Sequence, residues 1–181
     1  MPLPILLRGD HLGGSASYQA KSVIFDIATC WNTTVYMGVR AIDFWVDGAK
    51  ITMIPTTNYV SYHTSKASNS FLAKYAFDTT LSKVGAGGLV SWLSGGATTN
   101  QRIIIVFNVL TTFDDIKINN YHESGAVTSY GLRAVKIYTS TDAITSTVYG
   151  QAIANSVLIF DDELTIHVAS NQEDEQTLLL V

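Results

Sequence analysis

Apolar and polar residues alternate in short runs along most of the chain, and this period of two is typical of half-buried β-strands. Residues 21–28 (K-S-V-I-F-D-I-A) and 35–46 (V-Y-M-G-V-R-A-I-D-F-W-V) each predict a strand. Asp47-Gly48 is a hairpin-turn signal, and residues 49–54 predict the return strand. We therefore expect a β-hairpin early in the fold.

The same pattern resumes in the second half of the chain. Residues 102–108 (R-I-I-I-V-F-N) form a continuous apolar run, which predicts a core strand buried on both faces. Further strands are predicted over 113–119, 132–140, 145–150, 156–160, 163–169 and 177–181. A total of about ten short strands with turn signals between them predicts an all-β sandwich or barrel.

Three segments depart from the strand pattern. Residues 1–20 contain two prolines and a glycine pair, and they predict an extended N-terminal arm before a single β-sandwich domain at 21–181. Residues 56–70 and 79–101 are polar or glycine-rich and predict loops. Residues 71–78 (F-L-A-K-Y-A-F-D) predict a helical turn or two.

Composition and charge exclude several classes of function. The net charge is −4 and the basic residues are scattered, so we expect no nucleic-acid partner. No apolar run reaches the ~18 residues of a membrane span, and the start of the chain lacks the features of a signal peptide. We expect that the protein does not insert into a membrane and that it is made in a cytoplasm. The single cysteine, Cys30, predicts a buried thiol and no disulfide framework.

Residues 71–150 carry an ordered set of features. These are A-F-D at 76–78, a tryptophan at 92, the apolar strand at 102–108, I-K-I-N-N-Y at 116–121 and G-L-R-A-V-K-I-Y-T-S-T-D at 131–142. This set resembles the discoidin or coagulation-factor C-type domain, a galactose-binding-like jelly-roll β-sandwich. Thr79 stands where the family has glycine, and R-A-I-D-F-W at 40–45 lies upstream instead of at the C-terminus. That order resembles the permuted modules of bacteriophage structural proteins.

The resemblance implies a virion component such as a tail, fibre, baseplate or decoration protein, made in the host cytoplasm. Its partners would be other virion subunits, in a homo-oligomer or on a larger particle. The resemblance also implies one structural calcium held by Asp43 and Asp78. The alternative is that Asp78 caps a turn and Asp43 is an ordinary strand residue.

Sugar recognition in such modules uses aromatic and polar side chains on loops at one end of the sandwich. Two polar loops, 58–70 and 119–131, are the predicted binding loops, and we expect their aromatic rings to be exposed. Their candidate residues for glycan or partner binding are Tyr59, Tyr62, His63, Asn120, Tyr121, His122, Glu123 and Tyr130. The alternative is that these tyrosines pack over sandwich edges or line a subunit interface.

Catalysis has little support in the sequence. The four histidines are far apart in the chain and have no metal-ligand spacing, and the alternation around His167 places it on a solvent-facing side. We therefore expect a non-enzymatic virion protein acting in assembly, in host-glycan attachment or in both. A free-standing carbohydrate-binding lectin is the alternative, and a glycan hydrolase is a second one.

Overall fold

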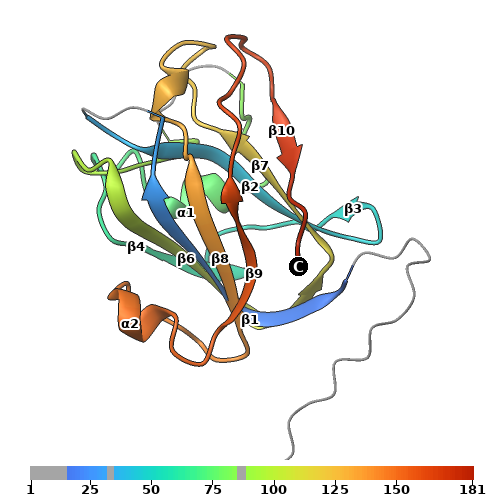
Figure 1. Ribbon diagram of the computed structural model, residues 1–181. Coiled ribbons are helices and arrows are strands. Elements are labelled where there is room, and N and C mark those ends of the chain that lie inside the picture. Colours follow the sequence, from blue (N-terminus) through green and yellow to red (C-terminus); the bar gives the residue numbers. More distant parts are fainter. Residues whose placement is uncertain (1–15, 32–34, 85–88) are drawn as a thin grey trace, which may run out of the picture.

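The computed structural model describes residues 16–31, 35–84 and 89–181. The strands form two antiparallel sheets, drawn in Figure 1. The strands are β1 (Tyr18–Thr29), β2 (Gly38–Val46), β3 (Ala49–Lys50), β4 (Tyr59–His63), β5 (Trp92–Leu93), β6 (Thr99–Phe113), β7 (Asp115–Asn120), β8 (Ala134–Ser140), β9 (Val157–Glu163) and β10 (Glu175–Thr177). The helices are α1 (Ala73–Phe77), α2 (Tyr149–Ala152) and a 3-10 turn, η1 (Thr128–Tyr130).

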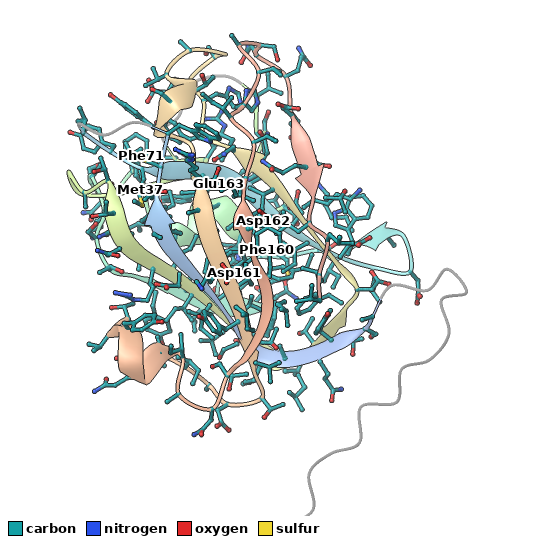
Figure 2. All side chains as sticks on the ribbon, viewed as in Figure 1. Met37, Phe71, Phe160, Asp161, Asp162 and Glu163 are labelled. Carbon is teal, nitrogen blue, oxygen red and sulfur yellow. The ribbon has the colours of Figure 1, made fainter. Side chains whose placement is uncertain are left out.

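One sheet has the strand order β4-β6-β1-β8-β9, and the other has the order β10-β7-β2-β3 with β5 also paired to β2. The main core lies between these sheets, where side chains fill the space (Figure 2). Alternation along β1 sends Val23, Phe25 and Ile27 into this core. Phe44 packs edge-on against Phe107 and Phe113 of the facing strand β6. The predicted all-β sandwich is confirmed, whereas the jelly-roll and galactose-binding-like assignments stay predictions.

The sheet with the order β4-β6-β1-β8-β9 also buries apolar side chains on its outer face, the face turned away from the other sheet. Ile24 of β1 and Ile104 of β6 are fully buried there and pack with Ala152 of α2. The segment 141–156, which contains α2, covers this face. The prediction that the apolar run at 102–108 is buried on both faces is therefore confirmed for its central residues.

The early hairpin forms at the predicted turn, but its return strand is shorter than predicted, because β3 covers only Ala49–Lys50 of residues 49–54. Trp45 pairs with Lys50 and Val46 with Ala49, while Asp47 and Gly48 take the positive φ values, 50° and 74°, that a tight hairpin turn requires. Helix α1 confirms the predicted helical turn. Neither α-helix of the described residues is long and apolar enough to span a membrane.

Other local predictions are wrong. Residues 59–63, predicted as loop, form β4, because they pair along residues 103–107 of β6. Residues 145–150, predicted as a strand, form a turn and the start of α2, since they cross over the sheet instead of joining it. Residues 164–168 are not a strand, and of the strand predicted over 177–181 only residue 177 belongs to a strand, β10. The predicted arm boundary at residue 20 falls inside β1, and residues 1–15 of that arm lie outside the described residues.

Candidate functional site

Asn120 closes the loop at 119–131, one of the two predicted binding loops. Its side-chain amide donates hydrogen bonds to the carbonyls of Leu132 (2.8 Å) and Thr165 (2.9 Å). Its Oδ1 accepts from the backbone N–H groups of Leu132 (2.7 Å) and Tyr121 (3.1 Å). Asn120 is fully buried, and both its amide nitrogen and its amide oxygen bind backbone groups. Its role is therefore to hold the ends of the loop together.

Tyr121 is fully buried beside it. Its hydroxyl donates a 2.6 Å hydrogen bond to Glu123 Oε1, and its ring stacks on that of Tyr130 with centroids 6.0 Å apart. Burial, and then the Glu123 carboxylate, raise the pKa of Tyr121 above its ordinary value. The tyrosine and glutamate of this loop therefore bind each other.

His122 is stacked on His167, with ring centroids 4.1 Å apart. The backbone N–H of Gly125 donates to Nδ1 of His122 (3.2 Å), and burial lowers the pKa of His122 to about 4, with the nearby His167 and Arg40 adding to the shift. His167 is only 2% exposed, and its two ring nitrogens contact the carbonyls of Val168 and Gln172. The prediction that His167 faces solvent is wrong, because the chain after β9 leaves the strand pattern.

The three candidates on β4 point to different places. Tyr59 lies in the main core, where its hydroxyl donates to the Lys74 carbonyl (2.7 Å), and burial raises its pKa. Tyr62 packs against the apolar cluster around Ile24 and Ile104 on the outer face of the sheet. His63 is half-buried, and burial, with the charge of Lys66, lowers its pKa. The expectation that these loops present exposed aromatic rings is therefore wrong for Tyr59, Tyr121 and His122.

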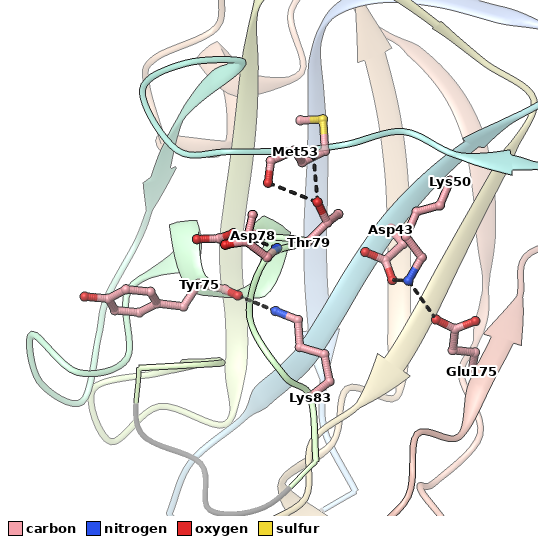
Figure 3. Close-up of polar contacts among 9 residues, drawn as sticks. Asp43, Lys50, Met53, Tyr75, Asp78, Thr79, Lys83 and Glu175 are labelled. Carbon is pink, nitrogen blue, oxygen red and sulfur yellow. Dashed lines mark hydrogen bonds and ion pairs between the residues drawn. The ribbon is translucent and has the colours of Figure 1, made fainter.

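The two predicted calcium ligands lie beside lysines (Figure 3). Asp43 is 2% exposed, and its Oδ2 lies 2.7 Å from the Lys50 amine, which also lies 3.5 Å from Glu175. Asp78 Oδ1 accepts hydrogen bonds from the backbone N–H (3.0 Å) and the hydroxyl (2.6 Å) of Thr80. These contacts are those of an ion pair and a turn cap, which fit the alternative interpretation of both residues.

Lys83 is a third group at this place and was not singled out from the sequence. It is 4% exposed, and its amine donates to the Tyr75 carbonyl (2.7 Å). Burial lowers the pKa of Lys83 to about 8, and the charges of Asp43 and Asp78 partly oppose that shift. Because Lys83 interacts electrostatically with both aspartates, its amine supplies the positive charge that a bound cation would otherwise supply. Within the described ranges, no group of three or more histidine, cysteine or acidic residues could hold a metal.

Arg40 joins the two predicted groups of residues and was also missed. It is fully buried on β2; its Nε donates to the Lys83 carbonyl (2.8 Å) and its Nη1 to the His122 carbonyl (3.5 Å). Burial lowers the pKa of Arg40, and the neighbouring Tyr121 and Glu123 oppose that shift. The signal in the sequence was an arginine in the otherwise apolar run G-V-R-A-I-D-F.

The result is one buried polar cluster on the side of β2 and β7, built from residues that mostly bind each other. Two side chains depart from this pattern within the described part of the chain. Asn119 of β7 is 1% exposed and has no hydrogen-bond partner at Oδ1 or Nδ2, and Nε2 of His122 has none either. Clusters of buried charges occur at catalytic sites and also as structural networks. The internal pairing of Asp43, Asp78, Tyr121 and Glu123 favours a structural network here.

No known protein family, no curated protein and no solved structure that was compared with this chain matches it.

Proposed function

We propose that the protein is a non-enzymatic structural subunit of a bacteriophage particle, made in the host cytoplasm, that assembles with neighbouring copies through its N-terminal arm. The proposal takes the virion setting, with its jelly-roll, galactose-binding-like fold, from the resemblance described above. The assembly contact comes from the surface chemistry of the sandwich.

The observation that carries the proposal is a groove between β9 and the C-terminal segment. Its volume is about 330 Å³. Phe160, Leu164, Leu178 and Leu179 contribute apolar lining. Leu179 is 86% exposed and, nearby, Val181 is 77% exposed, so apolar surface extends beyond the groove. Exposed apolar surface of this kind is typical of protein–protein contacts.

The rim of the groove is acidic. Asp161 is paired with Lys136 (2.7 Å) and Glu163 with Arg133 (3.1 Å). Asp162 lies between them, is exposed, and has no basic partner among the described residues. A ligand that matches this groove should combine an apolar stretch with a positive charge.

Residues 2–8 of the chain, P-L-P-I-L-L-R, have that composition. They belong to the arm that precedes β1, and β1 begins next to the groove. The Tyr18 hydroxyl donates to the Val181 carbonyl (2.7 Å), and the Tyr18 ring stacks on Phe113. We assign residues 2–8 of a neighbouring copy as the occupant, with Arg8 facing Asp162.

Deleting residues 2–15 tests this assignment without removing any residue of β1. We expect the shortened protein to melt as a folded sandwich but to lose incorporation into particles and self-association. Arg8→Glu should weaken association, and adding Asp162→Arg should restore it, because the charges are then exchanged. Val109→Asp, on an exposed site of β6, is the control for a surface charge change. Unchanged association of the deletion variant would overturn the proposal.

A further inference from the structure

The outer face of the sheet β4-β6-β1-β8-β9 carries a row of charged side chains that lies outside the main core. Strand pairing aligns Arg102 of β6 with Asp26 of β1, Asp26 with Lys136 of β8, and Lys136 with Asp161 of β9. Charges of alternating sign thus cross four strands. Next to Arg102 lies a depression of about 330 Å³, lined by Asp26, Asn100, Arg102 and Tyr149.

Arg102 is held in a fixed orientation in this depression. Its Nε donates to the Thr147 carbonyl (2.7 Å), and its Nη1 lies 3.0 Å from Asp26 Oδ1. The guanidinium has five N–H donors. Within the described part of the chain, Nη2 makes no hydrogen bond, and Oδ2 of Asp26 accepts none. A donor and an acceptor therefore remain on two side chains that contact each other and are only 12% and 15% exposed.

An aromatic ring and an amide complete the lining. Tyr149 begins α2 and is 47% exposed, with the Arg102 guanidinium 5.4 Å from its ring centroid. Asn100 is exposed and has a φ of 54°, a backbone conformation that asparagine tolerates better than most residues. Two bonds of Ser22 hold the covering segment in place, from Ile144 N–H to Oγ (2.8 Å) and from Oγ to the Asp142 carbonyl (2.7 Å).

The charge balance of the depression decides the class of ligand. Asp26 and Arg102 cancel each other, so a phosphate or a sulfate attracted by Arg102 would be repelled by Asp26. A neutral diol instead accepts from Nη2 with one hydroxyl oxygen and donates to Oδ2 with another hydroxyl. The exposed tyrosine ring provides an apolar platform for C–H groups beside such a diol, and a pocket with few fixed polar groups is typical of small-ligand sites.

We propose that the depression formed by Asp26, Asn100, Arg102 and Tyr149 binds a neutral saccharide unit, with a vicinal diol on the Asp26–Arg102 pair and a sugar face on the Tyr149 ring. This goes beyond the assembly function, and it places sugar recognition on the sheet face instead of in the loops at 58–70 and 119–131. The two functions use different residues and can be tested separately.

The test measures backbone amide shifts of the full chain by NMR as methyl glycosides of glucose, galactose, mannose and N-acetylglucosamine are added. We expect at least one glycoside to shift amides around residues 100–102 and 147–149, with a dissociation constant in the millimolar range. Inorganic phosphate is the comparison probe and should leave these amides in place. No shift with any glycoside, or shifts with phosphate alone, would overturn the proposal.

Substitutions then separate the ring from the amide. Tyr149→Ala should weaken binding about tenfold or more, whereas Tyr149→Phe keeps the ring and should bind nearly as the unaltered protein does. Asn100→Gly removes the amide at a backbone conformation that glycine accepts, and it should weaken binding by a smaller factor. Tyr75→Ala, which removes a partly exposed tyrosine from α1, is the matched control. Equal affinity of Tyr149→Ala and the unaltered chain would contradict the proposed site.

Discussion

Replacing Lys83 by methionine should stabilise the protein at neutral pH, and this gain should disappear at alkaline pH. Lys83 is 4% exposed, and burial lowers its pKa from 10.5 to about 8. The charged amine is therefore held in the folded protein at a cost, even though Asp43 and Asp78 lie close enough to reduce that cost. Methionine has a similar length and no charge.

The size of the effect follows from the pKa shift. Each pKa unit corresponds to ~1.4 kcal/mol, so holding the charged amine at pH 7 costs about 3 kcal/mol of folding free energy. Methionine also loses the 2.7 Å hydrogen bond to the Tyr75 carbonyl, which is worth about 1 kcal/mol. Asp43 keeps Lys50 as a partner and Asp78 keeps Thr80. We expect a net gain of about 2 kcal/mol at pH 7.

The dependence on pH identifies the amine as the cause. Between the folded pKa of about 8 and the unfolded value of 10.5, the unfolded chain holds a proton on Lys83 that the folded chain lacks. The contribution of Lys83 to stability therefore rises with pH across this window. The methionine variant lacks that rise, so its advantage over the unaltered protein should shrink from pH 8 upwards.

Urea unfolding, followed by tryptophan fluorescence at several pH values, measures the difference in free energy of unfolding. Taking the difference between two proteins at each pH cancels groups that titrate in both, such as Tyr59 and Tyr121. Lys66→Met is the control, because Lys66 is exposed and its amine donates to the side chain of Asn69. A methionine variant that is less stable at pH 7, or whose advantage is the same at all pH values, would refute the reasoning.

Two further predictions concern the same cluster. Asn119→Leu should raise the free energy of unfolding by about 1–3 kcal/mol in urea titrations, because it removes a buried amide that has no partner among the described residues; a loss of stability would show that the amide binds a water or a ligand. A calcium chelator should leave the melting temperature unchanged, because the Asp43 carboxylate is bound by Lys50; a marked fall would instead show that a cation binds there.

The early hairpin and the central strands could be predicted because their signals are local. Asp47-Gly48 takes the positive φ values of a tight turn without help from distant residues. Strand β4 was missed because its strand conformation depends on pairing with β6, about 40 residues away. Residues 145–150 have strand-like composition but cross over a sheet that is already complete, so they form a turn and the start of α2.

The burial of site residues was harder to predict than the strands. Tyr121 and His122 look like exposed loop residues in the sequence. In the structure, His122 stacks on His167 from the chain after β9, and that contact joins residues 45 positions apart. Arg40 and Lys83 were passed over because an isolated basic residue carries no motif. Their importance comes from the groups that distant segments place around them.

In the proposed assembly, the arm of one copy binds the groove of the next copy in a virion. A photo-crosslinking amino acid at Leu6, activated in purified particles and analysed by mass spectrometry, tests that claim directly. We expect the protein to be a component of the particle, with cross-links from residue 6 to peptides of a neighbouring copy that contain residues 157–181. Absence of the protein from the particles, or cross-links confined to other surfaces, would contradict it.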